Sequence, residues 1–435
     1  MKKVLIITYY WPPAGGPGVQ RVLKFVKYLP EFGWMPIVLT VNKGEYPSID
    51  ETLVSDIPDN IKVYKTNSLE PGFLYKKFTG MKENERIPTA VLAEKKPSLK
   101  KKIANWIRLN LFIPDAKIGW LPYAISEGKR IIDAEKPDLI FSSSPPPTVH
   151  LIARKLKKYS SLKWIADFRD PWTDIHYYED QNKIGISQRF DSRFEKAVLD
   201  EADKIVCVSQ YDIDMDFGKK VSVSKCINIA NGYDEMDFNG INRRATDRSK
   251  FTLMHLGVVG IERFPHNLLK IIVDLDKKKI ISEDNFQLTF VGKVENEVLQ
   301  VIDKYKIEKF IKFISYLPHN EALEYSSQAS ALLLLITQSR KNIRILPGKT
   351  FEYMRMGIPI LAMGPENGEV ASIFNKSEHY KVIDYSNHPA IYDFLVSMIN
   401  NHKKGLRTDI NPISVIENYE RKNLTKKLAS VFDNC

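Results

Sequence analysis

Cysteine is scarce in this sequence, and its few copies form no recognisable pattern. Cys207, Cys226 and Cys435 are the only three among 435 residues, and they do not form a C-x-x-C pair. A disulfide framework needs an even and denser set, whereas zinc and calcium sites need characteristic ligand spacings that do not occur here. The sequence therefore predicts a protein of a reducing compartment, with no disulfides, no metal site and no cofactor.

Long hydrophobic runs are also absent. No stretch approaches the roughly 18 apolar residues that a membrane-spanning helix needs. The apolar run after Met1 is short and is followed by Pro12, Pro13, Gly15 and Gly16, which do not form a cleavage region. We therefore expect a buried first strand in place of a signal peptide. The predicted location is the cytoplasm, with peripheral attachment to the inner face of the cell membrane as an open alternative.

Positive charge is in excess. The 64 Lys and Arg residues outnumber the 53 Asp and Glu residues, for a net charge of +11. Such a balance favours nucleic acid, an anionic membrane or an anionic substrate as partner. We find no zinc finger, aromatic RNA-binding motif or helix-turn-helix pattern, so nucleic acid is the least supported of these three partners.

Residues 95–112 differ from the rest in composition. Five lysines between positions 95 and 102 precede an amphipathic pattern that contains Trp106. A basic segment that leads into a Trp-containing amphipathic helix is typical of peripheral contact with an anionic membrane. A solvated lysine run beside a helix packed on its own domain explains the pattern equally well.

Short apolar runs alternate with amphipathic helical patterns along most of the chain, which is typical of parallel sheets built from βαβ units. A first series of strands is predicted at 4–8, 36–40, 139–142, 164–166 and 204–208. A second is predicted at 252–256, 287–291, 312–315, 331–336, 360–362 and 380–383. Helices are predicted at 19–29, 146–159, 187–202 and 414–432. The fold class is α/β, with two doubly wound parallel-sheet domains and a boundary near 235–250.

The most informative motif runs from Leu346 to Leu361. A Pro-Gly turn is followed by a short helix that carries Lys349 and Glu352 one turn apart, and Gly357 ends this helix before a buried strand. A helix N-terminus and a lysine suit a phosphate, while a carboxylate can accept hydrogen bonds from two ribose hydroxyls. We therefore predict a nucleotide site here in preference to a surface salt bridge.

Glycines follow the first strand of each predicted domain. Gly15, Gly16 and Gly18 follow the first, at the strand ends where ligands bind in open α/β sheets. Gly257 follows the corresponding strand of the second domain, with Arg263 placed to meet a diphosphate. The spacing is not that of a dinucleotide-binding fingerprint, which disfavours a dehydrogenase. A tight turn and an exposed loop arginine remain the structural alternatives.

Charged residues close another predicted strand. Asp167, Arg169 and Asp170 follow the strand at 164–166, where side chains point toward the ligand-binding edge. An acid, a base or a pair that holds hydroxyl groups would fit this position. Alternatively, Arg169 pairs with its neighbouring aspartates and braces the loop.

These segments together resemble the GT-B glycosyltransferases, and among them glycosyltransferase family four. The resemblance rests on Tyr-Tyr-Trp-Pro-Pro after the first strand, Ala-Asp-Phe-Arg-Asp-Pro-Trp from Ala166, Asn-Gly-Tyr-Asp from Asn231, and Pro-Gly-Lys-Thr-Phe-Glu-Tyr-Met from Pro347. It implies two Rossmann-like domains, at 1–238 on the acceptor side and 239–413 on the donor side, facing across a cleft. It also implies that the C-terminal helix, within 414–435, packs back onto the first domain.

The resemblance also assigns roles. It implies that Glu352 binds the donor ribose, that Gly16 with Gly15 and Gly18 approaches the diphosphate or the transferred sugar, and that Arg263 binds phosphate. Gly257 and Lys349 belong to the same donor site. Arg344 occupies the position of a further glutamate that many members carry near the donor sugar. Asp167 and Asp170 are the catalytic candidates, and Arg169 is placed on the acceptor side.

The implied function is transfer of a sugar from a nucleotide diphosphate sugar to a glycan or lipid-linked acceptor in cell-surface polysaccharide synthesis. Retention at the anomeric carbon and a mechanism without metal are implied by the family. Two alternatives stay open: a sugar-nucleotide epimerase of the same fold, and an inactive nucleotide-sugar-binding partner subunit.

Overall fold

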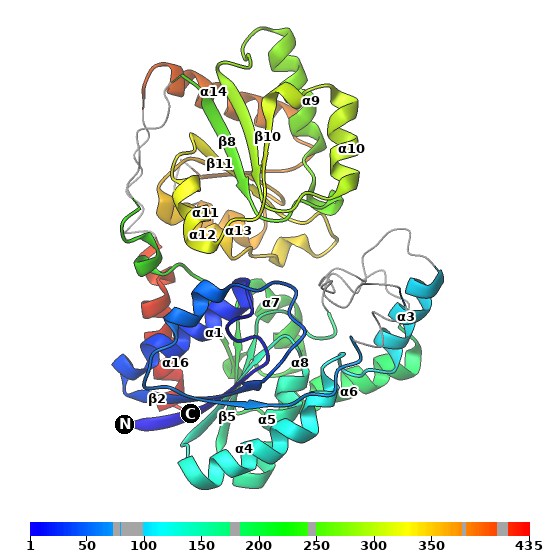
Figure 1. Ribbon diagram of the computed structural model, residues 1–435, viewed down its shortest axis with the longest axis vertical. Helices are drawn as coiled ribbons and strands as arrows, with labels where there is room; N and C mark the ends of the chain where they lie inside the picture. Colours follow the sequence, from blue (N-terminus) through cyan, green and yellow to red (C-terminus); the bar gives the residue numbers. More distant parts are fainter. Residues whose placement is uncertain (73–78, 80–98, 175–182, 242–248, 376–379, 407–415) are drawn as a thin grey trace. The chain divides into compact units, whose positions relative to one another are not determined.

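The computed structural model describes the chain except for residues 73–78, 80–98, 175–182, 242–248, 376–379 and 407–415 (Figure 1). The described residues divide into two compact units. Unit 1 contains Met1–Asn231 together with Arg421–Cys435, and unit 2 contains Gly232–Glu420. Each unit is built on a parallel sheet flanked by helices, so the predicted α/β class with two Rossmann-like doubly wound domains is confirmed.

The sheet of unit 1 has seven parallel strands in the order β3-β2-β1-β4-β5-β6-β7. The strands are β1 (Lys2–Thr8), β2 (Trp34–Val41), β3 (Lys62–Thr66), β4 (Leu139–Ser144), β5 (Lys163–Phe168), β6 (Lys204–Cys207) and β7 (Cys226–Asn228). The described helices are α1 (Pro17–Tyr28), α3 (Leu99–Asn110), α4 (Leu121–Glu135), α5 (Thr148–Ser160), α6 (Gly185–Glu201), α7 (Gln210–Asp212), α8 (Gly218–Lys220) and α16 (Arg421–Asp433).

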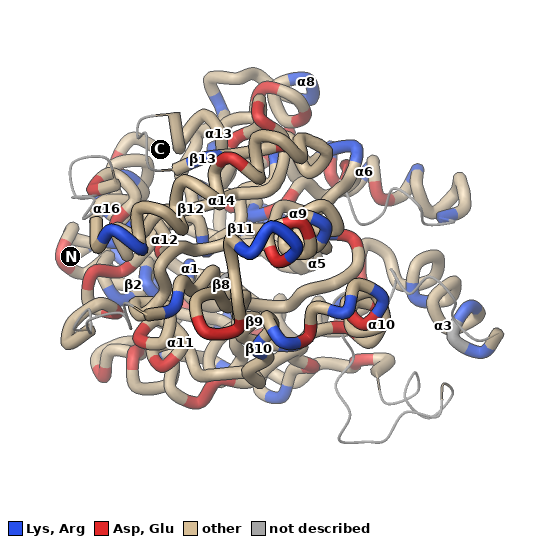
Figure 2. Tube along the Cα trace, turned by 90° about the horizontal axis from the view of Figure 1, so that it is seen from above, with Lys and Arg blue, Asp and Glu red and all other residues tan. Residues whose placement is uncertain are grey.

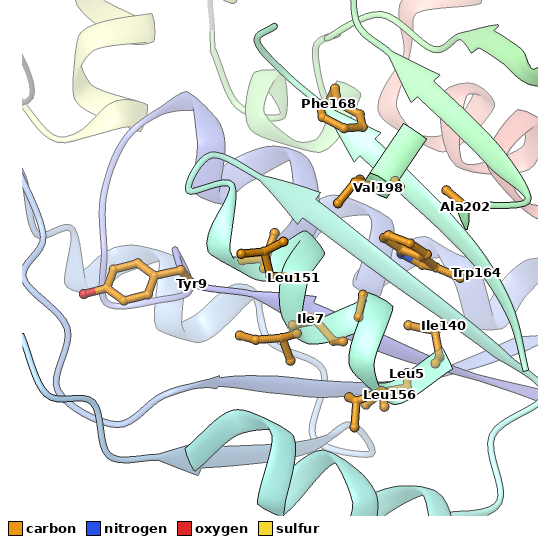
Figure 3. Packing of buried hydrophobic residues seen from close by; sticks show 14 of the residues in the cluster. Leu5, Ile7, Tyr9, Ile140, Leu151, Leu156, Trp164, Phe168, Val198 and Ala202 are labelled. Carbon is orange, nitrogen blue, oxygen red and sulfur yellow. The ribbon is translucent and has the colours of Figure 1, made fainter. Parts of the chain in front are cut away.

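Both faces of this sheet are buried, which explains why its central strands are apolar at successive positions. Leu5, Ile7 and Trp164 point to the face covered by α4, α5 and α6, where Leu156 and Val198 pack against them (Figure 3). The intervening residues of the same strands point to the opposite face, which is covered by α1 and α16.

The C-terminal helix α16 belongs to the core of unit 1. Leu424, Leu428 and Phe432 are buried with residues of β1 and α1. The Phe432 ring lies edge-on to Trp34, with 5.2 Å between the ring centroids. The chain thus leaves unit 1 after Asn231 and returns to it at Arg421.

The sheet of unit 2 has six parallel strands in the order β10-β9-β8-β11-β12-β13, the same winding as in unit 1. Its strands are β8 (Phe251–Leu256), β9 (Phe286–Val291), β10 (Ile311–Ile314), β11 (Ala331–Leu335), β12 (Ile360–Met363) and β13 (Tyr380–Ile383). The described helices are α9 (His266–Lys277), α10 (Asn296–Tyr305), α11 (His319–Ser326), α12 (Lys349–Met356), α13 (Glu369–Phe374) and α14 (His388–Lys403). Because the strand order reverses at β8 and β11, ligand-binding loops are expected at the carboxyl ends of these central strands.

Candidate functional site

The loop between β1 and α1 needs its glycines. The Gly15 N–H donates to the Ser48 carbonyl at 3.0 Å, and a Cβ atom on Gly15 would lie only 3.0 Å from Ser48 Oγ. Gly16, with φ +105°, caps the start of α1 in a conformation that other residues rarely adopt. These glycines therefore form a tight turn against Ser48, and their predicted approach to the diphosphate stays a prediction.

Asp167 lies wholly inside unit 1. Its carboxylate accepts hydrogen bonds from Arg21 Nη2 at 2.7 Å, Arg21 Nε at 3.1 Å and Ser143 Oγ at 2.6 Å. The side chains of Asp167 and Arg21 are both 0% exposed. Two hydrogen bonds from Arg21 to one carboxylate form a buried bidentate ion pair, which gives Asp167 a structural role. Its predicted catalytic role stays a prediction.

Arg169 braces the end of β4 through main-chain carbonyls. Its Nε donates to the Ser144 carbonyl and its Nη2 to the Pro145 carbonyl, each at 2.7 Å. The guanidinium lies against Gly18, where a Cβ atom would come within 2.2 Å of Arg169 Nη1. Asp170 follows in the turn and is half-buried. The structure therefore brings Gly18 and Arg169 together, while Asp167 pairs with Arg21.

In unit 2, the predicted short helix is α12, and it begins at Lys349. Gly357 ends it with φ +60°, and β12 follows, as the sequence motif indicated. The Lys349 side chain extends across the end of β8, so that a Cβ atom on Gly257 would lie 2.8 Å from Lys349 Nζ. Gly257 also has φ +120°. A glycine is therefore required here by both conformation and space.

The charge on Lys349 is only partly compensated. Burial lowers the pKa of Lys349, Glu352 opposes that shift, and the positive charge of Arg263 adds to it. Within the part of the chain that the structure describes, no carboxylate lies within ion-pair distance of Lys349 Nζ. Four residues of the predicted donor site thus lie near the carboxyl ends of the central strands of unit 2: Gly257, Arg263, Lys349 and Glu352. An anionic ligand would balance the positive charge there.

Two polar atoms near this edge were not identified from the sequence. His255 Nδ1 hydrogen-bonds with the Leu333 carbonyl at 2.9 Å, so Nδ1 carries the proton and Nε2 is an acceptor. Burial lowers the pKa of His255 to about 3, which keeps the ring neutral. His255 Nε2 and Thr350 Oγ1 are both buried without a hydrogen-bond partner among the described residues. For His255 the only sequence signal was a histidine near the end of a predicted strand, and no signal singled out Thr350.

Glu352 has a histidine beside it. His319, the first residue of α11, places Nε2 3.7 Å from Glu352 Oε1 and 3.6 Å from Asp237 Oδ2. The Glu352 side chain is 14% exposed, so its carboxylate still reaches solvent. No sequence spacing links residues 237, 319 and 352, because three separate segments bring them together.

The two donor-side arginines differ in environment. Arg263 ends the short helix η9 (Ile261–Arg263), is about one-third exposed, and its Nε contacts Glu262 Oε1 at 3.1 Å. Arg344 ends the short helix η11 (Asn342–Arg344) and is buried. The assigned phosphate contact of Arg263 and the sugar-side position of Arg344 both stay predictions.

We also searched the described residues for a metal-binding group and for a helix that could span a membrane. Among them, no group of three or more His, Cys, Asp or Glu side chains could hold a metal ion. None of the helices in the described ranges is both long enough and apolar enough to cross a bilayer.

Comparison with known proteins identifies the fold and finds a match to one family model over part of the chain. Residues 88–235 match the model of Glycosyltransferase Family 4. The sucrose-phosphate synthase of Thermosynechococcus elongatus superposes with a TM-score of 0.67 at 12% identity, covering 100% of this chain and 99% of that chain. HepE of Anabaena, solved with UDP-glucose, gives a TM-score of 0.63 at 12% identity, covering 100% of both chains.

A glycosyltransferase from Rickettsia africae gives a TM-score of 0.62 at 14% identity, covering 100% of this chain and 98% of that chain. No curated protein sequence matches the chain significantly. The matches confirm the GT-B fold and the resemblance to family-four glycosyltransferases. At these identities the solved structures establish fold alone, so donor and acceptor need separate arguments.

Proposed function

We propose that this chain, which has the GT-B fold and matches the Glycosyltransferase Family 4 model over residues 88–235, transfers a sugar from a nucleotide diphosphate sugar. The acceptor is a glycan or a lipid-linked sugar in cell-surface polysaccharide synthesis. The reaction retains anomeric configuration and uses neither metal nor cofactor. HepE, a structure of the same fold, was solved with UDP-glucose, which supports a nucleotide sugar as donor.

One observation carries the proposal. Lys349, the first residue of α12, extends over Gly257 at the end of β8, and Glu352 lies one turn further along α12. The N-terminus of α12 has no side-chain cap hydrogen bond, so its backbone N–H groups are suited to a phosphate. Lys349 would add a full charge and Glu352 would accept from the ribose hydroxyls. Arg263 would reach the same diphosphate.

This arrangement suits departure of a nucleoside diphosphate. Negative charge develops on the leaving diphosphate as the glycosidic bond breaks, and fixed positive charge stabilises it most in a water-poor site. Lys349, Arg263 and the helix N-terminus supply that charge.

A peripheral contact with anionic membrane through residues 95–112 completes the proposal. Residues 95–98 lie outside the described part, and α3 covers most of the rest. Leu99 is 74% exposed, while Ile103 and Trp106 are each 44% exposed. Lys and Arg line the same helix (Figure 2), and its sequence has no acidic residue. An exposed apolar stripe between basic residues is what an anionic lipid surface binds.

The test is to incubate the purified protein with uridine, guanosine and adenosine diphosphate sugars, with and without a membrane lipid extract, and to measure nucleoside diphosphate release. Release that depends on the extract supports the transferase. Isomerisation of the donor sugar without acceptor supports the epimerase, and tight binding without turnover supports an inactive partner subunit. Failure to bind any donor contradicts the proposal.

A further inference from the structure

The short helix η8 (Glu235–Phe238) is held against α12, the helix that carries Glu352. Arg355, one turn after Glu352, donates from Nε to Glu235 Oε2 at 2.6 Å and from Nη2 to Glu235 Oε1, so the two side chains form a bidentate ion pair. The Arg355 guanidinium also lies over the Phe238 ring, with 5.1 Å between Cζ and the ring centroid. These contacts fix the place of η8 beside α12.

The backbone of η8 is fixed by the residue that precedes it. The Asp234 carboxylate accepts a hydrogen bond from the Met236 N–H at 3.1 Å, and the Asp234 carbonyl accepts one from the Asp237 N–H at 3.0 Å. Aspartate is among the residues preferred at this capping position. The Asp237 side chain therefore projects from a segment whose conformation is set by local hydrogen bonds and by the Arg355 ion pair.

His319 lies between the carboxylates of Asp237 and Glu352. Its Nε2 is 3.6 Å from Asp237 Oδ2 and 3.7 Å from Glu352 Oε1. All three side chains are less than one-fifth exposed, so water and salt screen these charges only in part. Two carboxylates this close to one atom repel each other, and a positive charge or an N–H between them offsets that repulsion.

His319 restricts the Glu352 carboxylate. Among the described residues, it is the only group of opposite charge within ion-pair distance of Glu352. A glutamate side chain is flexible, and ordering it costs conformational entropy. A carboxylate that accepts hydrogen bonds from two neighbouring hydroxyls must present its oxygens in one orientation, and a supporting contact behind it maintains that orientation.

We propose that His319 and Asp237 are positioning residues for Glu352. His319 holds the Glu352 carboxylate in the orientation that accepts hydrogen bonds from the ribose hydroxyls of the donor, and Asp237 holds His319. The proposal rests on the proposed function, because it takes Glu352 as the residue that binds the ribose. It adds a specificity: the site binds a ribonucleoside diphosphate in preference to its 2′-deoxy counterpart because the carboxylate is held in place.

The test compares a ribonucleoside diphosphate with its 2′-deoxy counterpart by isothermal titration of the full chain. The uridine, guanosine and adenosine forms are each titrated, and the pair that binds most tightly is used throughout. The wild type should bind the 2′-deoxy nucleotide at least about tenfold more weakly, the loss typical of one hydrogen bond to a charged group. A wild type that binds neither nucleotide, or both equally, overturns the proposal.

His319→Leu removes the contact with Glu352 and keeps a side chain of moderate size. It should weaken binding of the ribonucleotide more than binding of the 2′-deoxy nucleotide, so that the preference for ribose falls below about threefold. His319→Gln should restore most of the preference, because its amide can still donate to the carboxylate. Asp237→Asn should lower the preference by a smaller factor, about twofold to threefold.

The matched control is His388→Leu. His388 is likewise the first residue of a helix of unit 2, α14, and its Nε2 lies 3.8 Å from Asp274 Oδ2. This variant should keep the wild-type preference for ribose. Equal weakening of both nucleotides in His319→Leu, or an unchanged preference, means that the contact is merely structural and overturns the proposal.

Two further outcomes are separable. If His319→Leu does not fold, Asp237→Asn decides, and a wild-type preference in that variant overturns the proposal. Failure of the proposed function would appear as absence of sugar transfer by a wild type that still prefers the ribonucleotide. Loss of that preference in His319→Leu would then support the positioning role independently of transfer.

Discussion

The sheets of the two units have the same strand order, but charged side chains at the carboxyl ends of their strands are compensated in different ways. In unit 1, the Asp167 carboxylate is fully engaged by Arg21 and Ser143 and is 0% exposed. In unit 2, Lys349 has no carboxylate within ion-pair distance among the described residues, and Gly257 keeps space open beside it. The charge of Asp167 is therefore neutralised within unit 1, whereas the charge of Lys349 in unit 2 is left for a ligand.

We therefore expect Asp167 to contribute mainly to stability and Lys349 mainly to ligand binding. A buried, paired carboxylate contributes mainly to folding, and its removal leaves an uncompensated charge. A partly compensated lysine at a helix N-terminus contributes mainly to anion binding. Substitutions at the two edges should therefore have effects of different kinds, and the following experiments test that separation in order of expected effect.

Asp167→Asn should lower the free energy of unfolding of unit 1 by about 3–5 kcal/mol, because it leaves the Arg21 charge buried and unpaired. All six tryptophans lie in the segments of unit 1, so tryptophan fluorescence during urea unfolding reports on this unit. Asp200→Asn removes an exposed carboxylate paired with Lys196 and should change stability by less than about 1 kcal/mol. An Asp167→Asn protein of unchanged stability but without activity would favour the catalytic role over the structural one.

Lys349 should make donor binding depend on pH. Because burial lowers its pKa, the ammonium loses its charge at a lower pH than an ordinary lysine would. Donor affinity should therefore be highest below that pKa and fall as pH rises through it. In Lys349→Arg, whose side chain stays charged, the decline at high pH should disappear. Affinity can be measured by titration calorimetry at each pH, and identical pH profiles for the two proteins would contradict this role.

Trp106→Ala should weaken binding to anionic vesicles about threefold to tenfold, because an indole contributes to interfacial binding through its buried apolar area. Phe313→Ala is the control, since Phe313 is similarly exposed, at 45%, but lies on β10 of unit 2. Co-sedimentation with vesicles of phosphatidylserine and phosphatidylcholine measures the difference. Equal binding by both variants and the wild type would contradict a membrane contact through α3.

The central strands were predictable from sequence because both of their faces are buried. Each of the eleven strands expected from apolar runs corresponds to a strand of the two sheets. The strands that were missed, β3 and β7, are at the two edges of the unit 1 sheet and are half-buried. An edge strand packs little apolar surface, so its residues do not form the run that identifies a central strand.

The candidate site was predictable only where it is local. Lys349 and Glu352 lie one turn apart on α12, and a single motif reveals them. The pairing of Asp167 with Arg21 joins residues from β5 and α1, and nothing in the spacing predicts it. His319 reaches Glu352 from α11 in the same way. Contacts between distant segments depend on packing, which local sequence patterns do not contain.

The most direct test of the central claim compares donor binding by Glu352→Ala with that of the wild type, using the nucleotide sugar that the release assay identifies. Glu283→Ala is the control, because Glu283 is exposed in the turn before β9, at the amino ends of the strands and thus opposite to the predicted donor site. We predict that Glu352→Ala abolishes measurable donor binding while Glu283→Ala binds like the wild type. Wild-type affinity in Glu352→Ala would contradict the assignment of the donor site to α12.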